Sequence, residues 1–123
     1  MTDLASLPAS LGVSEAELFG DLPSTGPRAG ADVGEPQTWT RVLYDRGAIN
    51  CGIWECTPGG WFISDRPNTE IVHVLRGAAT ITDEDGSTRS LVAGSALVLP
   101  KGWSGRWDIT ETIRKLYITI DGI

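Results

Sequence analysis

A carboxylate and a nearby guanidinium are the first residues of this chain that suggest chemistry. Glu70 opens the apolar run Glu70–Leu75, where a carboxylate without a partner would be costly to bury. Ser64 and Arg66 precede it at even offsets, so their side chains share its face if the strand continues through the intervening turn. We therefore expect an ion pair between Arg66 and Glu70, whose guanidinium could also bind a ligand carboxylate. The alternative is an exposed Arg66 on a turn and a Glu70 that accepts hydrogen bonds from backbone amides.

Further side chains able to move protons or stack on a ligand lie toward the C-terminus. Lys115 and Tyr117 alternate with Leu116 and Ile118, so one face of the last strand carries two hydrogen-bond donors. Glu70 as general base, with Lys115 or Tyr117 as acid, would make a catalytic site, whereas a solvent-facing strand is the alternative. The residues predicted to contact a ligand are Trp61, Ser64, Arg66, Trp103 and Trp107.

Five tryptophans are many for a chain of 123 residues. Trp103 and Trp107 share a face if both lie on one strand, and such a pair could stack on a planar or cationic ligand. Gly105 between them can let the backbone pass close to an indole. Trp39 and Trp54 are expected to fill the core, as large aromatic residues commonly do in small barrels.

From Trp39 onward the sequence alternates short β-type runs with turn residues. Turn signals such as Thr57-Pro58-Gly59-Gly60 and Asp83-Glu84-Asp85-Gly86 separate the runs, and no long helical pattern intervenes. This pattern favours an all-β sandwich or barrel over a parallel sheet with helical crossovers. The predicted strands are Thr38–Tyr44, Ile49–Cys56, Trp61–Ser64, Glu70–Leu75, Ala78–Thr82, Thr88–Val92, Ser95–Leu99, Arg106–Ile109 and Arg114–Ile120.

Residues 1–37 are predicted to form an N-terminal arm, and residues 38–123 the barrel domain. The arm carries six acidic residues and one basic residue, so it accounts for −5 of the net charge of −6. Ser14 and Glu17 form an S-x-x-E capping box, which predicts one short helix. The following segment, Gly20–Pro36, is rich in Gly, Pro, Ser and Asp and is expected to be extended.

The run Glu70–Leu75 is mostly apolar on both faces. A strand without a polar face needs cover on two sides, of which one can be the barrel interior. The second cover could be another sheet, the N-terminal arm or a second subunit.

A series of residues between Trp54 and Tyr117 carries a resemblance to a known family. They are Glu70, Gly77, Asp85-Gly86, Gly94, Pro100-Lys101-Gly102, Gly105-Arg106-Trp107, Glu111, Arg114-Lys115 and Tyr117. In order and spacing they resemble the cupin superfamily, and most of all the small single-domain cupins of the ureidoglycine-aminohydrolase and ethanolamine-utilisation type. The resemblance implies an RmlC-like double-stranded β-helix, that is, a jelly-roll barrel of two antiparallel sheets. It also implies a homodimer with a ligand pocket inside the barrel.

The metal ligands of the metal-binding members are mostly absent from this chain. Those cupins carry His-x-His followed by a Glu, and a further His in a second motif. The matching positions here hold Ser64, Arg66, Glu70 and Gly105, so only the carboxylate is present and no metal cofactor is predicted. His73 is the only histidine and is expected on the opposite face from Glu70, so metal binding by both would need a β-bulge.

Composition argues against several classes of function. A net charge of −6 disfavours nucleic acid and acidic membrane surfaces, and no apolar run is long enough to span a membrane. Cys51 and Cys56 would lie about 16 Å apart on a straight strand, which is too far for a disulfide. Reduced thiols and the lack of a leader-like segment are typical of a cytoplasmic protein. Neither a serine-type triad nor a nucleotide-binding glycine loop can be recognised.

Three functions are consistent with these observations. The first is a metal-free cupin that binds a small polar metabolite in the barrel and could be an enzyme through Glu70. The second is a metal-dependent enzyme, similar to the aminohydrolases, that acts on a small nitrogen-containing metabolite. The third is a non-catalytic structural or regulatory cupin whose barrel is filled by its own side chains. An open pocket around Glu70 would favour the first of these functions.

Overall fold

The structure is a computed structural model that describes residues 7–123, and these residues form one short helix and nine strands. The helix is α1 (Glu15–Phe19). The strands are β1 (Ser24–Pro27), β2 (Ala31–Val33), β3 (Gln37–Arg46), β4 (Ile49–Cys56), β5 (Gly59–Ile63), β6 (Asn68–Asp83), β7 (Thr88–Val92), β8 (Ala96–Leu99) and β9 (Gly105–Asp121).

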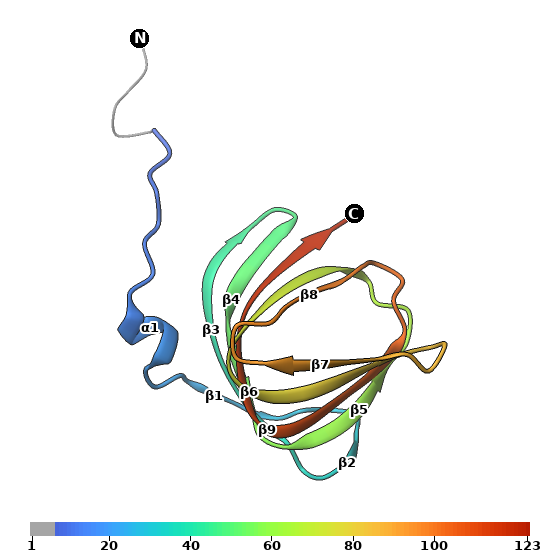
Figure 1. The fold of residues 1–123 in the computed structure, drawn as a ribbon. Coiled ribbons are helices and arrows are strands. Elements are labelled where there is room, and N and C mark those ends of the chain that lie inside the picture. Colours follow the sequence, from blue (N-terminus) through green and yellow to red (C-terminus); the bar gives the residue numbers. More distant parts are fainter. Residues whose placement is uncertain (1–6) are drawn as a thin grey trace.

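All strand pairs are antiparallel, and the two longest strands organise them. Strand β9 pairs with β6 along one edge, while its other edge pairs first with β5 and then with β4. Strand β6 likewise pairs with β8 along its first half and with β7 along its second half. Figure 1 shows how β6 and β9 curve together so that the sheet curls into a barrel. The predicted all-β barrel with a short N-terminal helix is confirmed.

The prediction from the sequence was wrong in dividing each of the two longest strands, β6 and β9, into two strands. Glu70–Leu75 and Ala78–Thr82 belong to the single strand β6, and the last two predicted strands are likewise joined as β9. The register between β6 and β9 shifts at several points between Val74 and Ala79. Gly77 lies in this region with a φ of +93°, so it marks an irregularity that bends the strand rather than its end.

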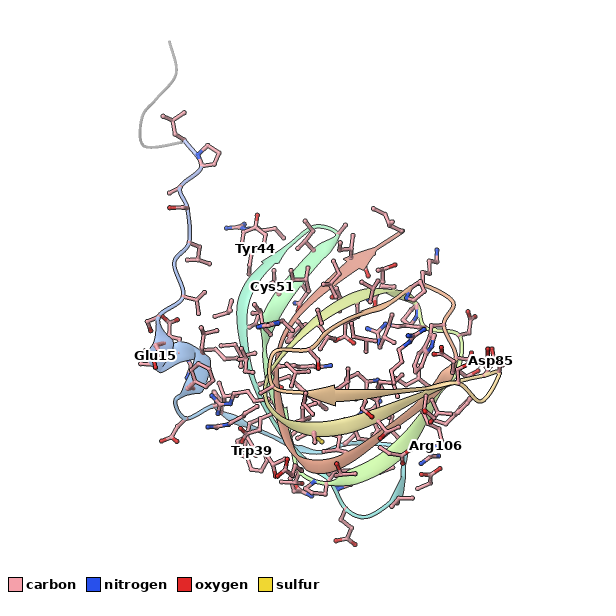
Figure 2. The ribbon with its side chains drawn as sticks, viewed as in Figure 1. Glu15, Trp39, Tyr44, Cys51, Asp85 and Arg106 are labelled. Atoms are coloured by element: carbon pink, nitrogen blue, oxygen red, sulfur yellow. The ribbon has the colours of Figure 1, made fainter. Side chains whose placement is uncertain are left out.

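The N-terminal segment is tied to the barrel by hydrogen bonds. The capping box starts α1, since Ser14 Oγ accepts a hydrogen bond from the backbone N–H of Glu17. Arg114 Nη1 donates to the carbonyl of Leu18 at 2.9 Å, which holds the end of the helix beside the sheet. Strands β1 and β2 then pair with β3 and β5, so part of the predicted arm extends the barrel sheet. In Figure 2, Glu15 on this helix and Asp85 in the β6–β7 turn lie at opposite ends of the molecule.

The side chains of β6 alternate between the barrel interior and the outer surface. Glu70, Val72 and Val74 are buried, whereas Ile71 and His73 are exposed. The interior is filled mainly by aliphatic residues and tryptophans, and these surround the buried carboxylate. No other part of the described chain covers Ile71, which is 38% exposed. Across residues 7–123 there is no helix with the length and hydrophobicity that crossing a bilayer requires.

Candidate functional site

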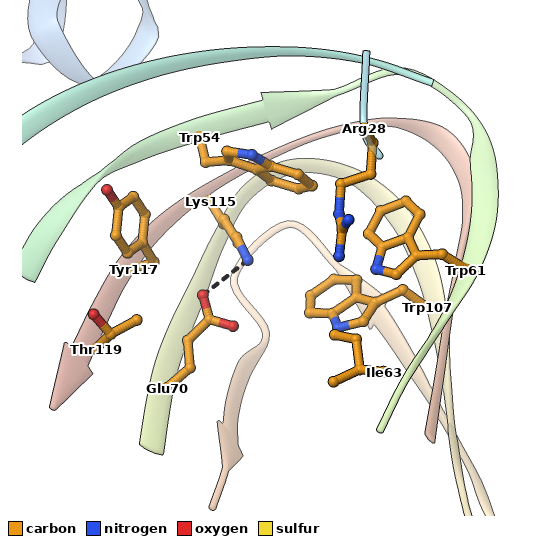
Figure 3. Close-up of a pocket in the computed structure, with 9 residues that line it drawn as sticks. All are labelled: Arg28, Trp54, Trp61, Ile63, Glu70, Trp107, Lys115, Tyr117 and Thr119. Carbon is orange, nitrogen blue, oxygen red and sulfur yellow. Dashed lines mark hydrogen bonds and ion pairs between the residues drawn. The ribbon is translucent and has the colours of Figure 1, made fainter. Parts of the chain in front are cut away.

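A cavity of about 200 Å³ lies inside the barrel beside Glu70. Strands β4, β5, β6 and β9 supply most of its walls, and the connection between β1 and β2 supplies one cationic side chain (Figure 3). Alternate residues of β9 point into it because the side chains of a strand alternate between its two faces. The lining residues are Arg28, Trp54, Trp61, Ile63, Glu70, Trp107, Lys115, Tyr117 and Thr119.

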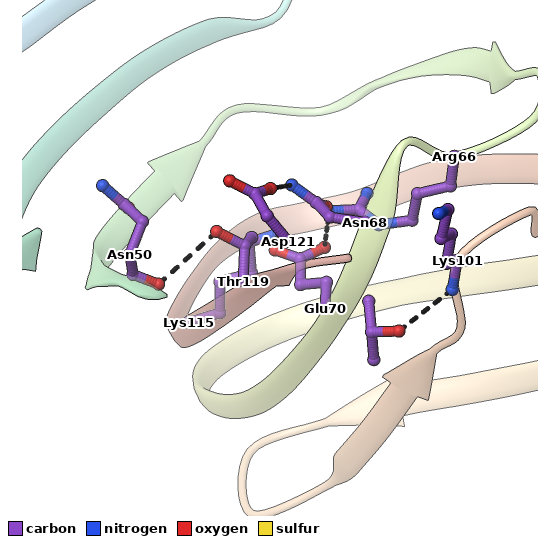
Figure 4. A network of polar contacts seen from close by, with 9 residues as sticks. Asn50, Arg66, Asn68, Glu70, Lys101, Lys115, Thr119 and Asp121 are labelled. Carbon is purple, nitrogen blue, oxygen red and sulfur yellow. Dashed lines mark hydrogen bonds and ion pairs between the residues drawn. The ribbon is translucent and has the colours of Figure 1, made fainter. Parts of the chain in front are cut away.

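Two cationic side chains hold the carboxylate of Glu70. Lys115 Nζ donates to Oε2 at 2.9 Å, and Arg66 Nη2 lies 3.5 Å from Oε1. The side chains of Glu70 and Lys115 are 7% and 9% exposed, so this pair is largely removed from water. Arg66 Nη2 also donates to Asn68 Oδ1, and Asn68 donates in turn to Asp121, as Figure 4 shows. The predicted contact between Arg66 and Glu70 is therefore present within a larger polar network.

Three tryptophans surround the ammonium group of Lys115 and the space next to it. Lys115 Nζ lies 4.5 Å from the ring centroid of Trp54 and 4.7 Å from that of Trp107. Trp61 and Trp107 are nearly parallel, with an interplanar angle of 11° and centroids 6.3 Å apart. Trp54 meets Trp61 edge to face at 6.2 Å. The rings shield the Lys115 charge from water and stabilise it through their negative faces.

The connection between β1 and β2 places Arg28 over the aromatic wall. Its guanidinium carbon lies 4.8 Å from the centroid of Trp61. One guanidinium nitrogen donates to the backbone carbonyl of Ala29. Burial lowers the pKa of Arg28 from its ordinary value, although the group stays protonated at neutral pH. Arg28 therefore adds a second permanent cation to the pocket.

The hydroxyl and thiol groups near the pocket keep their protons at neutral pH. Burial raises the pKa of Tyr117, and the nearby acidic groups Cys51, Glu70 and Asp45 raise it further. Burial also raises the pKa of Cys56 to about 11. Tyr117 can therefore donate a hydrogen bond to a ligand but cannot act as a ready base.

A glycine makes room for the Tyr117 ring. Gly52 pairs with Tyr117 across β4 and β9. A Cβ at Gly52 would lie 2.6 Å from the Tyr117 hydroxyl and 2.6 Å from the carbonyl of Arg41. The position of the phenol in the pocket therefore depends on the absence of a side chain on the facing strand.

Five of the eight predicted site residues line the cavity: Glu70, Lys115, Tyr117, Trp61 and Trp107. Arg66 contacts Glu70 without lining the cavity.

Ser64 and Trp103 are not brought into the cavity. Ser64 is exposed because it follows the end of β5. Trp103 lies in the turn before β9, where strand alternation does not apply, and its Nε1 donates to Asp83 Oδ1 at 2.8 Å. Its ring packs over Gly105, where a Cβ would lie 2.4 Å from Trp103 Cζ2.

Four lining residues were not predicted as site residues: Arg28, Trp54, Ile63 and Thr119. Trp54 enters the cavity because it is the register partner of the inward-facing Lys115, and the sequence does not indicate this pairing of β4 with β9. Thr119 continues the alternation of Lys115 and Tyr117 along β9, so the sequence alone indicates that it shares their face. Nothing in the sequence around Arg28 indicates that it reaches the pocket.

The residues at the expected metal position do not fit a metal ion. The cationic Arg66 occupies one of the histidine positions, and Glu70 already accepts from Lys115. Across residues 7–123, no three His, Cys, Asp or Glu side chains are grouped closely enough to hold a metal. His73 lies on the outer face of β6, on the opposite side from Glu70.

The curled antiparallel barrel, with a pocket between its walls, has the architecture of a cupin domain. A family model of the EutQ-like cupin domain matches residues 43–117, and the chain belongs to this family. No curated protein matches the chain.

Solved structures agree with this fold. The EutQ protein of Salmonella typhimurium is 23% identical with a TM-score of 0.65, and the match covers 80% of this chain and 79% of that one. The EutQ protein of Clostridium difficile is 21% identical with a TM-score of 0.62, covering 70% and 69%. A protein of unknown function from Pseudomonas syringae pv. tomato is 20% identical with a TM-score of 0.75, covering 82% of this chain and 45% of that one.

Proposed function

We propose that this protein binds a small polar metabolite in the barrel pocket and that it does so without a metal ion. The observation that carries the proposal is the engagement of both Glu70 oxygens, one by Lys115 and one by Arg66. Beside this ion pair the barrel keeps a cavity of about 200 Å³ instead of filling with side chains. An open cavity next to Glu70 supports the binding function over that of a filled, purely structural barrel.

The charges around Glu70 disfavour a divalent cation at this place. A metal on the carboxylate would sit beside the ammonium group of Lys115 and the guanidinium of Arg66. Two unit charges of the same sign about 4 Å apart repel by about 4 kcal/mol at the effective dielectric constant of a protein, and a divalent ion doubles this repulsion. A metal would therefore have to displace both cations from their present partner.

Elemental analysis tests the metal-free part of this proposal. We expect purified protein to contain no stoichiometric transition metal, even after incubation with Mn²⁺, Fe²⁺, Ni²⁺ or Zn²⁺ followed by desalting. Glu84→Gln removes an exposed carboxylate from the hairpin turn and is the control for Glu70→Gln. Stoichiometric metal in the wild type and in Glu84→Gln, but not in Glu70→Gln, would overturn the proposal in favour of a metal-dependent enzyme.

Ligand retention tests the binding part. The wild type is incubated with the small-molecule fraction of a cell extract, desalted and denatured, and the released compounds are identified by mass spectrometry. Thr119→Phe fills the cavity from β9 and serves as the blocked variant. We expect a compound that the wild type retains and Thr119→Phe does not. Equal profiles from two folded proteins would refute binding in this pocket.

Acid–base catalysis is a second candidate, because the three predicted catalytic residues converge on one cavity. Glu70 would accept a proton from a bound substrate, and Lys115 or Tyr117 would donate one. Lys115 donates to Glu70, so a substrate has to replace this hydrogen bond before Glu70 can act as a base. Consumption of an extract component by the wild type, but not by Glu70→Gln or Tyr117→Phe, would establish this activity.

We further propose that a second copy of the chain covers the outer face of the sheet. Ile71 on β6 pairs with Val98 on β8 and with Ile118 on β9, and Ile118 pairs with Cys51 on β4. These residues form an apolar row across four strands, in which Ile71 and Val98 are 38% and 58% exposed. Exposed apolar patches of this kind are typical of subunit interfaces.

We also propose that this protein is cytoplasmic. Cys51 and Cys56 are both free thiols on β4. Oxidising compartments favour disulfides, so unpaired thiols support a reducing environment.

A further inference from the structure

We infer that the pocket takes a small organic acid with a flat apolar body, and that Arg28 and Trp61 hold its carboxylate. This inference rests on the proposed function, because it specifies the ligand of the same pocket.

Arg28 is the first donor in this argument. Its backbone N–H donates to the carbonyl of Pro36 at 2.9 Å, which fixes the turn between β1 and β2 and aims the side chain at the pocket. Within residues 7–123 no carboxylate lies within ion-pair distance of its guanidinium. By contrast, Arg106 is fully engaged by Asp32 and Asp108. A half-buried guanidinium that lacks a carboxylate partner is suited to receive one from a ligand.

The indole N–H of Trp61 is the second donor. Trp61 is 2% exposed, and its Nε1 has no hydrogen-bond partner among the described residues. Buried donors without an acceptor are rare in native proteins, so an acceptor from a ligand is the simplest partner. In Figure 3 the Trp61 nitrogen lies on the side of the ring that faces the end of the Arg28 side chain. A single carboxylate can accept from both groups, because it has two oxygens with several lone pairs.

The charges of the site decide between an anionic and a cationic ligand. Three tryptophans around a cavity would otherwise suggest a cage for a quaternary ammonium group. Here the protein's own cations already occupy the ring faces, since Lys115 lies over Trp54 and Trp107 and Arg28 lies over Trp61. A cationic ligand would meet both of these charges at short range. With Arg66 included, the site holds three cations, of which two contact its one carboxylate, Glu70, so an anion improves the charge balance of the site.

The other residues that line the cavity determine which groups the ligand carries besides its carboxylate. Ile63 and the parts of the Trp54 and Trp107 rings that Lys115 does not cover present apolar surface, which favours a flat hydrocarbon or aromatic group. The hydroxyls of Tyr117 and Thr119 lie on the same strand further along the cavity and can bind one polar substituent. A volume of about 200 Å³ restricts the ligand to a small molecule of this kind.

Matched probes test this inference. Benzoate, benzamide and benzylamine share one ring and differ in charge, and their binding is measured by titration calorimetry and by quenching of tryptophan fluorescence. We expect benzoate to bind the wild type at least about tenfold more tightly than benzamide, because the charged hydrogen bonds to Arg28 are lost in the amide. Benzylamine is expected not to bind.

Substitutions of Arg28 then test whether this residue causes the preference for benzoate over benzamide. Arg28→Gln should weaken benzoate binding by about tenfold or more and leave benzamide unchanged, while Arg28→Lys keeps the charge and should show intermediate affinity. Arg46→Gln removes an exposed arginine from the β3–β4 hairpin and should behave as the wild type. Circular dichroism melts confirm that each variant is folded.

Each contrary result has a distinct meaning. Equal affinity for benzoate and benzamide, or benzoate binding that is unchanged in Arg28→Gln, would overturn the carboxylate site while leaving the proposed function intact. Failure of all three probes to bind the folded wild type would overturn the assignment of a flat monocarboxylate. Binding in this pocket, on which the inference rests, fails separately, if Thr119→Phe and the wild type retain the same compounds from an extract.

Discussion

The ammonium group of Lys115 lies 2.9 Å from a carboxylate oxygen of Glu70, although 45 residues separate the two in the sequence. They stand on the neighbouring strands β6 and β9, where Lys115 is the register partner of Val74 rather than of Glu70. The lysine side chain therefore crosses the inner face of the sheet to reach the carboxylate, and its ammonium group lies over the rings of Trp54 and Trp107. This one contact fixes the polar end of the pocket against its aromatic walls.

Removing the charge of Glu70 and removing the charge of Lys115 should lower the free energy of unfolding by different amounts. Glu70→Gln leaves Lys115 and Arg66 buried without a counter-charge and should cost about 3 kcal/mol of unfolding free energy. Lys115→Met should cost less, because Arg66 still neutralises the carboxylate. The double variant should be less destabilised than the sum of the single variants, as measured by urea unfolding. Glu84→Gln, an exposed change, should stay within about 0.5 kcal/mol of the wild type, and strict additivity would contradict the coupling.

Two glycines with nearly the same positive φ angle should differ sharply in their tolerance of a side chain. Gly77 and Gly94 have φ angles of +93° and +90°. A Cβ on Gly77 would lie 2.2 Å from the carbonyl oxygen of Thr112, whereas a Cβ on Gly94 meets nothing within 4 Å. Gly94→Ala should cost about 1 kcal/mol through its backbone alone, and Gly77→Ala about 3 kcal/mol or more because the facing strand must move. Equal melting temperatures for the two variants would refute the close approach of β6 and β9.

Stability should decline at alkaline pH because a buried thiol resists ionisation. Burial raises the pKa of Cys56 from 9.0 to about 11, and the nearby cations Arg28 and Lys115 only partly oppose this shift. Above pH 9 the unfolded thiol loses its proton while the folded one keeps it, so the free energy of unfolding falls as pH rises toward 11. The contribution is fully present below pH 9 and amounts to about 2 to 3 kcal/mol.

Urea unfolding at several pH values measures this decline. Cys56→Ala should flatten it, and Cys51→Ala should do so to a smaller extent, because that thiol is less buried. An alkaline decline that is identical in the wild type and Cys56→Ala would show that the thiol does not contribute.

The apolar row on the outer face should control the oligomeric state. Ile71→Lys places a charge in the middle of this row and should convert a dimer into a monomer, as measured by size-exclusion chromatography with light scattering. Phe62→Lys is the matched control, since Phe62 is also an exposed apolar residue but lies on β5, which pairs with the other end of β9. A monomeric wild type, or dissociation by both variants alike, would refute the proposed interface.

Much of the architecture could be predicted from local patterns. The capping box at Ser14 predicted α1, and the strand Ile49–Cys56 was predicted with the bounds that the structure shows. The joined strands could not be predicted, because Gly77 is typical of a strand end and only its pairing with β9 shows that the strand continues.

The site residues likewise include some that the sequence indicates and others that only the tertiary structure places. Alternation along a strand is a local property with a period of two, so it placed Lys115 and Tyr117 on one face and His73 opposite Glu70 from the sequence alone. Which faces meet across a barrel depends on long-range pairing and on irregularities in register, and these arise only when the whole sheet closes. That is why only the tertiary structure brings Arg28 and Trp54 into the pocket and leaves Trp103 bonded to Asp83 outside it.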